Sequence, residues 1–427
     1  MTSPAFVLRL VALAATAVLG YGCNTPQDHT GLRWWKGNLH AHSLWSDGDH
    51  YPEMVIDWYK QHGYHFVQLS EHNVLADGEK WIAVEARGGR AAYERYVARF
   101  GPNWVASRTD SMGLHVRLKT ISEYGPVFEE EARFVVLQGE EITDAFASKP
   151  VHLNATHVVE LVHPQHGSSV HEVIENNVAA LREQRFRMDQ PMIVHVNHPN
   201  FGWAVEPGDL IRVEQVRFFE VYNGHPAVHN EGDSTRPSTE RLWDIVLAER
   251  LAGQEPLLYG IAVDDAHHYH EFDSSRANAG RGWIMVRAPR LTPEALISAM
   301  EAGDFYCSTG VVLDDVHVEH DHLSLDIRPE PGVRYTTQFI GTRHGYSTSM
   351  RLAPQRDSAM MGEGYSEEIG VLLDEVPGAQ PRYLFRGDEL YVRAKVISSR
   401  LKPNPSRSGE LEAAWTQPVV PRLDAGR

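Results

Sequence analysis

Short apolar segments that each end in a cluster of polar side chains recur along this chain, and they constrain its fold more than any other feature. Five such segments and the clusters that follow them are 66–69 with Ser70-Glu71-His72-Asn73, 133–137 with Gly139-Glu140-Glu141, 191–196 with Asn197-His198-Pro199-Asn200, 216–221 with Tyr222-Asn223-Gly224, and 257–263 with Asp264-Asp265-Ala266-His267-His268. Helix-like segments such as 53–62 and 238–251 lie between them. Strands that alternate with helices favour a parallel α/β sheet or barrel. In a (β/α) barrel the loops after the strands meet at one mouth, so we expect these clusters to share one site.

A His-x-His motif stands at the start of this series. His40 and His42 are two residues apart, so both imidazoles point to the same face if the segment is extended. Asp47 follows in a polar loop, and His72 lies at the end of the first apolar segment. Imidazole and carboxylate groups are the ligands of zinc, manganese and iron. A lone His-x-His is equally consistent with unrelated surface histidines, but the repetition of polar clusters at strand ends favours a metal site.

The charge of the chain limits its partners. The formal net charge is −17 at pH 7, which disfavours a nucleic-acid partner because the phosphate backbone is itself negative. A local basic pocket for a small anion is compatible with that total. We therefore expect a small-molecule, anionic substrate and no nucleic acid.

The first 23 residues have the pattern of an export signal. Arg9 precedes an apolar run, 10–19, that is too short to span a bilayer and is typical of a signal peptide. Cys23 follows small residues, as in a bacterial lipoprotein signal, although the bulky Tyr21 departs from that pattern. We expect an exported protein, which is periplasmic, carried on the outer surface or secreted, with membrane contact only through a possible lipid at Cys23. Cys307 is then expected to be a buried, unpaired thiol.

The pattern changes along the chain and indicates two domains. Residues 32–310 contain the alternating segments and are predicted to form the barrel. Within them, 74–131 has no strand that ends in a ligand cluster and is interpreted as an insertion that could wall the site. From about 311 to 427 apolar and polar residues alternate between turn residues, which predicts a small β-rich C-terminal domain.

The order of these motifs resembles the PHP family, the polymerase-and-histidinol-phosphatase metallohydrolases. The resemblance is carried by His40-x-His42, Asp47, Glu71-His72, Glu141, His152, His198 and Asp265-x-His267. Two further stretches, 305–310 and 414–418, are similar to a secreted, carbaryl-hydrolase-like branch of that family. The resemblance implies a distorted (β/α)7 barrel that holds two or three divalent metal ions, which are zinc, manganese or iron.

The same resemblance implies the metal ligands. They are His40, His42, Asp47, His72, Glu141, His152, His198, Asp265 and His267. Glu71 stands where the family usually has aspartate, at a position that typically supports the ligands. Glu140 competes with Glu141 for the carboxylate that bridges two ions, and His157 competes with His152. We favour Glu141 and His152.

Four other residues are candidates for roles beside the metal. His195 could protonate a leaving group or orient a ligand, or it could be a hydrogen-bonded core histidine. Arg276 and Arg281 follow the Asp265-x-His267 cluster and could hold a substrate anion, or they could form ordinary salt bridges. Asn223 ends a strand together with Glu220 and Tyr222, which gives it a possible place in the substrate pocket.

These features lead to one expected function and two alternatives. The expected function is a metal-dependent hydrolase, a phosphoesterase in which a metal-bridging hydroxide attacks a small phosphate ester. The first alternative is an amide, carbamate or carboxylic-ester hydrolase that uses the same metal site. The second is an exported metal- or glycan-binding protein without turnover.

Overall fold

The computed structural model describes residues 31–213, 215–347 and 364–421 of the chain. The predicted export signal and Cys23 lie outside these residues. Among the helices of the described ranges, none combines the length and the apolar character that crossing a membrane requires.

Seven strands form the body of the molecule. In the order in which they are hydrogen-bonded they are β1 (Arg33–Asn38), β2 (Phe66–His72), β6 (Val135–Phe146), β7 (Lys149–Thr156), β8 (Ile193–Val196), β9 (Phe218–Asn223) and β10 (Tyr259–Val263). Their central residues are buried because helices cover the outer face of the sheet. The predicted α/β class is confirmed, and five of the strands lie within a few residues of the segments expected from the sequence.

The first and last of these strands meet beyond their ends. A parallel bridge pairs Ala41 with Ala266, the His42 N–H donates to the Ala266 carbonyl at 2.9 Å, and the Asp265 N–H donates to the His40 carbonyl at 3.0 Å. These bonds close the seven strands into a distorted barrel. The two ligand pairs predicted from the sequence therefore lie at the line of closure.

The direction of β7 departs from the expectation of a parallel sheet. β7 pairs antiparallel with both β6 and β8, whereas β1–β2, β2–β6, β8–β9 and β9–β10 are parallel. β6 and β7 are joined by only two residues, and so short a connection can return the chain only in the opposite direction. The strand was not predicted, because its sequence contains Pro150, His152 and Asn154 in place of an apolar run.

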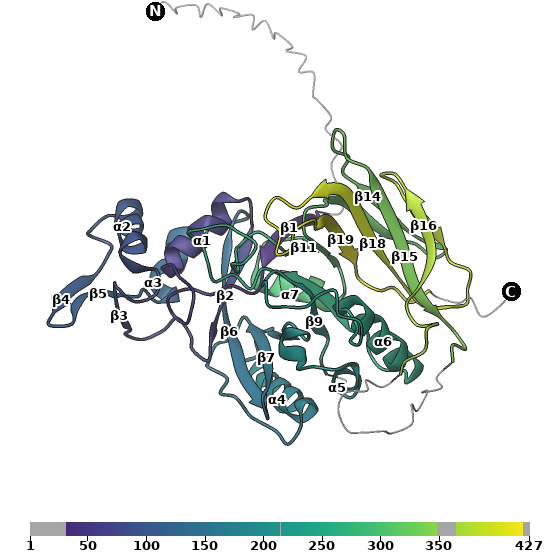
Figure 1. Ribbon diagram of the computed structural model, residues 1–427, viewed down its shortest axis with the longest axis horizontal. Helices are drawn as coiled ribbons and strands as arrows, with labels where there is room; N and C mark the ends of the chain where they lie inside the picture. The colour runs from purple at the N-terminus through teal and green to yellow at the C-terminus, as the bar shows by residue number, and fades with distance from the viewer. Residues whose placement is uncertain (1–30, 214, 348–363, 422–427) are drawn as a thin grey trace, which may run out of the picture.

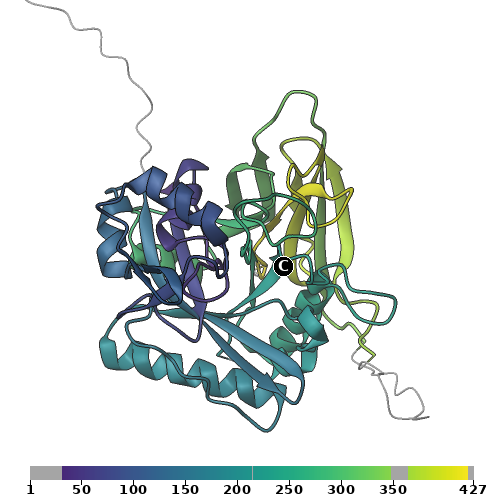
Figure 2. The same ribbon diagram turned by 60° about the vertical axis from the view of Figure 1, so that its left-hand side comes forward.

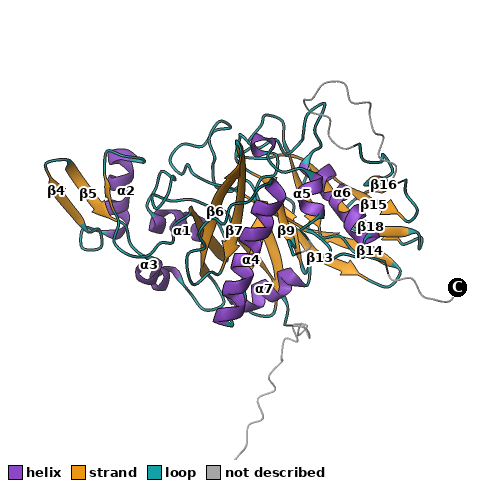
Figure 3. Ribbon diagram, turned by 90° about the horizontal axis from the view of Figure 1, so that it is seen from below, coloured by secondary structure: helices purple, strands orange, loops and turns teal. Residues whose placement is uncertain are grey.

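Helices on the outside of the barrel connect most of the strands. They are α1 (Pro52–Gln61), α4 (Val170–Met188), α5 (Pro207–Ile211) and α6 (Thr239–Ala252). The Ser169 and Ser238 side chains cap α4 and α6 by accepting hydrogen bonds from the backbone N–H groups of Glu172 and Arg241. Figure 3 shows α4, α5 and α6 side by side over the strands of the barrel.

The 74–131 insertion is a separate layer beside the barrel, at the left of Figure 1. It contains β3 (Trp81–Ala83), α2 (Gly89–Phe100), β4 (Ser107–Asp110), β5 (Gly113–Arg117) and α3 (Ile121–Phe128), and its three strands form their own sheet. The Tyr96 ring stacks on Tyr51 at 4.2 Å, which packs α2 against the barrel. α2 begins at Gly89, and both Gly88 and Gly89 have positive φ, a conformation that glycine adopts readily.

The C-terminal region is rich in β-strands, as predicted. β11 (Trp283–Ala288) and β12 (Phe305–Ser308), with α7 (Pro293–Glu301) between them, extend the barrel sheet from β1. The same sheet continues through β19 (Leu411–Thr416), β18 (Glu389–Leu401), β15 (Tyr335–Arg343) and β16 (Val371–Pro377). β13 (Leu313–Val318), β14 (His322–Ile327) and β17 (Arg382–Leu384) form a further sheet, and the whole region lies opposite the insertion (Figures 1 and 2).

Cys307 of β12 is a buried thiol, as expected. Its side chain is 0% exposed and its sulfur donates to the Gly260 carbonyl, and burial raises its pKa. A thiol without solvent access and without a thiolate is inert toward ordinary oxidants.

A buried ion pair joins the C-terminal sheet to the barrel. The Arg393 guanidinium of β18 donates to both carboxylate oxygens of Asp244 on α6, at 2.8 and 2.7 Å, and the Tyr391 hydroxyl donates to the same carboxylate at 2.8 Å. Both charged side chains are less than 5% exposed. Removing Asp244 would leave the buried guanidinium with only the longer contact to Glu240, at 3.5 Å.

We therefore predict that Asp244→Ala lowers the free energy of unfolding by about 3–5 kcal/mol, because the buried Arg393 charge loses its two shortest ion-pair contacts and keeps only the longer one to Glu240. Urea unfolding followed by circular dichroism measures the change. Arg328→Ala is the control: Arg328 pairs with Asp314, but both side chains are largely exposed, so we expect a loss of less than about 1 kcal/mol. Equal effects of the two variants would contradict the role assigned to the buried pair.

Candidate metal centre

All nine predicted ligands lie in one continuous cluster at the mouth of the barrel. They are His40, His42, Asp47, His72, Glu141, His152, His198, Asp265 and His267, and each has a nitrogen or oxygen within 3.6 Å of a neighbouring member. The residues come from the ends of β1, β2, β8 and β10, from the middle of β6 and of β7, and from the loop after β1. Seven of the nine are buried or nearly so, while Asp47 and His72 face solvent at the rim.

The two histidines of the His-x-His motif face two carboxylates. His40 Nε2 lies 3.4 Å from Glu141 Oε2 and 3.2 Å from Asp265 Oδ1, and His42 Nε2 lies 3.3 and 3.4 Å from the same two oxygens. Ligand atoms that share one ion at bond lengths of about 2.0–2.2 Å lie roughly 3.2–3.6 Å apart in tetrahedral geometry. The four distances therefore fit a shared divalent ion.

The His42 ring supplies an independent test of that fit. Its Nε2 is buried and has no hydrogen-bond partner in the described structure. An unpaired polar atom in a buried site is costly unless another ligand satisfies it. A metal ion at this point would do so, and the donor set of imidazole and carboxylate is the one that zinc, manganese and iron prefer.

Asp47 lies close to three histidines on the solvent side of the cluster. Its Oδ1 lies 3.6 Å from His42 Nδ1, 3.5 Å from His72 Nε2 and 3.3 Å from His267 Nε2. These four residues form one of the groups whose ligand atoms are close enough to hold a single ion. The Asp47 side chain is 31% exposed, so this outer group is open to solvent.

Glu141 occupies the middle of the cluster. Its Oε1 lies 2.9 Å from His152 Nδ1 and 3.5 Å from His198 Nε2, and its Oε2 faces His40, His42 and His72. One carboxylate thus takes part in two of the groups that could each hold an ion. A bridging carboxylate requires this position.

The structure places the residues of the two open alternatives differently. Glu140 alternates with Glu141 along β6 and points to the opposite face, where its Oε2 accepts a hydrogen bond from the Val162 N–H at 2.8 Å. Burial raises the Glu140 pKa to about 8. His157 bonds to the Pro191 carbonyl, whereas His152 contacts Glu141. Glu141 and His152 are therefore the members of the cluster.

Glu220 orients the inner ligands from behind. Its Oε1 lies 2.6 Å from His40 Nδ1 and 3.2 Å from His195 Nε2, and its Oε2 accepts from the His198 N–H at 2.7 Å. A carboxylate behind a ligand imidazole fixes the tautomer so that the other nitrogen faces the metal. His195 is 0% exposed and is held by Glu220, so its contacts suit a positioning role more than proton transfer to a substrate.

Two supporting residues were missed by sequence reasoning. Asn197 donates from Nδ2 to Glu141 Oε1 at 2.9 Å, and the ring of His225 lies 5.6 Å from that of His267. Both stand in or beside the polar clusters at strand ends, which is the only signal the sequence contains. Glu71 supports the site in another way: its carboxylate accepts from the Ser43 N–H and the Ser46 hydroxyl and so holds the loop before Asp47.

The three candidate substrate-binding residues are placed differently from the expectation. Arg281 is 0% exposed and donates to the carbonyls of Gly224 and Asp273, so its guanidinium links the loops that contain these two residues. Arg276 pairs with Glu271 and Asp273 at the surface. Asn223 donates to Glu220 and Asp265, which makes it a support for ligands. Both arginines pair with protein groups, as in the structural alternative, and no recorded contact among the described residues joins either of them to the cluster. Their anion-holding role stays a prediction.

Burial and mutual charge determine the ionisation of the cluster. Burial alone would raise the pKa of Glu141 and of Asp265, but the neighbouring histidines outweigh it and hold both well below the ordinary value. Burial and the adjacent His267 lower the pKa of His42, and burial lowers that of His152. For His40 the burial penalty is exceeded by Asp265, Glu220 and Glu141, and its pKa is raised. Metal binding must therefore displace a proton from His40.

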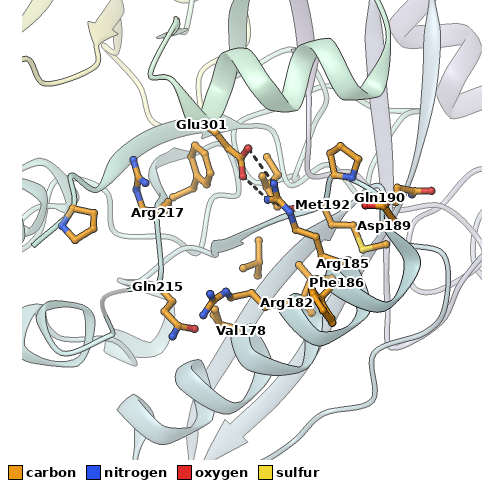
Figure 4. A pocket seen from close by; sticks show the side chains of 16 residues that line it. Val178, Arg182, Arg185, Phe186, Asp189, Gln190, Met192, Gln215, Arg217 and Glu301 are labelled. Atoms are coloured by element: carbon orange, nitrogen blue, oxygen red, sulfur yellow. Dashed lines mark hydrogen bonds and ion pairs between the residues drawn. The ribbon is translucent and has the colours of Figure 1, made fainter.

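A cavity of about 840 Å³ lies away from this centre (Figure 4). It is lined by the C-terminal part of α4, by the beginnings of β8 and β9, and by Glu301 of α7. Arg185 pairs with Glu301 across it. None of its lining residues belongs to the cluster, and it opens at the N-terminal ends of the strands, where barrels rarely carry chemistry.

We predict that Glu141→Gln reduces the bound metal by at least one ion per chain, whereas Glu140→Gln leaves the metal content unchanged. The two substitutions are isosteric neighbours on one strand, so each controls for the other. Elemental analysis of protein purified without chelator measures the content. Equal metal loss in both variants would refute the central position of Glu141.

The raised pKa of Glu140 predicts a pH effect on stability. Between the unfolded value near pH 4.5 and the folded value near pH 8, the folded chain keeps a proton that the unfolded chain has released. This contribution to stability is therefore lost as the pH rises through that range. Glu140→Gln removes the titration, so its unfolding free energy relative to the original protein should increase by roughly 4 kcal/mol from pH 5 to pH 9. A constant difference across pH would contradict this assignment.

Comparison with known proteins finds structural similarity only. No protein-family model and no curated protein matches the chain. A two-domain protein from Bacteroides vulgatus that contains a predicted PHP-like metal-dependent phosphoesterase matches at 14% identity and a TM-score of 0.41, over 91% of this chain and 96% of its own. A Bifidobacterium adolescentis protein, also assigned only by inference to the metal-dependent phosphoesterases, matches at 13% identity and a TM-score of 0.29, over 54% and 87%. At these identities and TM-scores neither similarity carries an argument about this chain.

Proposed function

We propose that the protein is a metal-dependent hydrolase, and specifically a phosphoesterase that acts on small phosphate esters. One observation carries the proposal: four groups of imidazole and carboxylate atoms, each compact enough for one ion, overlap through the shared residues His40, His42, His72 and Glu141. Overlapping groups place ions close together, and adjacent ions suit the in-line displacement at phosphorus.

The chain's own residues prepare this site. The nine ligands would hold two or three divalent ions. Such ions lower the pKa of water to about 7 and neutralise charge on phosphoryl oxygens. Glu220 and Asn197 keep His40 and Glu141 in position through hydrogen bonds of 2.6 and 2.9 Å. The burial of the inner ligands limits competing water and strengthens their electrostatic effect on a bound anion.

The two alternative functions predict different experimental results. A carbamate, amide or carboxylic-ester hydrolase would use the same ions but would act on a neutral carbonyl. A binding protein without turnover would keep its metal and convert nothing. The complete ligand set, in which no position is replaced by an inert residue, favours an enzyme over a binding protein.

We predict that the metal-loaded protein hydrolyses phosphomonoesters or phosphodiesters in preference to aryl carboxylic esters, and that chelation abolishes this activity. His40→Ala and Asp265→Ala should each lower kcat/KM at least a hundredfold and reduce the bound metal, because each removes an inner ligand. His317→Ala is the control, since His317 pairs with Asp326 on the exposed C-terminal sheet. Full activity of the chelated protein would contradict the proposal that hydrolysis depends on metal. Intact metal without turnover would favour the binding protein.

A further inference from the structure

We propose that Arg87 binds the anionic group of the substrate at the mouth of the metal centre and selects phosphate monoesters over diesters. This inference rests on the proposed phosphoesterase function and names the substrate class of the same site. Arg87 belongs to the insertion, just before α2, and neither its side chain nor its position was singled out by the sequence.

The first observation is the place of the guanidinium. Arg87 Nη1 lies 3.8 Å from Asp47 Oδ2, and Asp47 Oδ1 in turn faces His42, His72 and His267. The Arg87 side chain is 59% exposed, on the same open side as the rim ligands. A positive charge therefore stands at the entrance to the outer group of ligands, within reach of an anion bound there.

The second observation is how the backbone holds Arg87 in that place. Gly88 has φ of +76°, and a Cβ at this residue would lie 2.2 Å from the Asp49 carbonyl oxygen. Only glycine permits so close an approach with this conformation. The insertion therefore packs tightly on the 47–49 loop, and Arg87 reaches Asp47 because the two backbones are adjacent.

The third observation is that the Arg87 donors have no other acceptor among the described residues. Its one recorded contact is the 3.8 Å ion pair, which is longer than a hydrogen bond. Exposed pairs at such distances contribute little to stability. Lys80 of the insertion and the buried Arg281 differ from Arg87, because Lys80 donates to the Trp45 carbonyl and Arg281 donates to the Gly224 carbonyl. In a chain of net charge −17, Arg87 is thus a cation at the site with free donors.

The chemistry of the guanidinium indicates the substrate. Its planar fork matches two oxygens of a phosphate, and the hydrogen bonds are charge-assisted. A monoester has three terminal oxygens and two negative charges. When some of these oxygens coordinate the metal ions, another can still accept a hydrogen bond from Arg87. A diester has one charge and a second organic group in that space. A monoester should therefore gain more from Arg87.

The experiment compares Arg87→Ala with Arg90→Ala, its matched control. Arg90 lies on the same insertion with a similarly exposed side chain, 54%, but pairs with Glu85 away from the cluster. The KM for p-nitrophenyl phosphate should rise about tenfold in Arg87→Ala with less than a threefold change in kcat. The KM for bis(p-nitrophenyl) phosphate should change less than threefold, and Arg87→Lys should recover part of the loss. Both variants should keep their metal content by elemental analysis.

A binding measurement separates this inference from the proposed function. Inorganic phosphate titrated into the metal-loaded protein by calorimetry should bind about tenfold more weakly to Arg87→Ala, and unchanged to Arg90→Ala. Equal phosphate affinity in Arg87→Ala and the original protein would overturn the role of Arg87 even if hydrolysis is seen. Absence of phosphoester hydrolysis in the original protein would overturn the proposed function, while the phosphate titration would still decide the role of Arg87.

Discussion

The closure of the barrel between β1 and β10 is the contact on which the site depends. The Asp265 N–H to His40 carbonyl bond and the His42 N–H to Ala266 carbonyl bond join segments more than 220 residues apart. The residues that make these bonds are themselves ligand candidates or their direct neighbours. The same two backbone bonds therefore close the barrel and bring the His-x-His pair opposite Asp265. A shift in the pairing of these two segments by one residue would separate His40 and His42 from Asp265.

The buried charges of this centre require compensation. Carboxylates and imidazoles at full burial are costly unless each finds a partner. Glu220 supplies one at His40, and Asn197 supplies one at Glu141, yet His42 Nε2 is left without a hydrogen bond. A divalent ion bound to His42 Nε2 would supply the missing partner. Metal affinity and the stability of this part of the barrel are therefore coupled.

Three parts of the chain converge on the mouth of the barrel. The barrel strands carry the ligands, and the insertion brings Arg87 to Asp47. The loop between β18 and β19 contacts the end of β9 and the loop after it: Lys402 donates to the Tyr222 hydroxyl, and Arg407 donates to the Val228 carbonyl. The C-terminal region thus supports the loops that follow β9, beside Asn223 and His225, although none of its described residues belongs to the cluster.

The sequence by itself determined what local pattern can encode. Apolar runs that end in polar clusters predicted five barrel strands, the motif order predicted nine residues that lie together in one cluster, and alternation predicted the β-rich C-terminal region. The tertiary structure alone decided the antiparallel direction of β7, the choice of Glu141 over Glu140, the burial of Arg281 and the approach of Arg87 to Asp47. These depend on contacts between residues far apart in the chain, such as His40 with Glu220, 180 positions away. Periodicity reports which face of its own element a side chain occupies, but not which element will lie opposite that face.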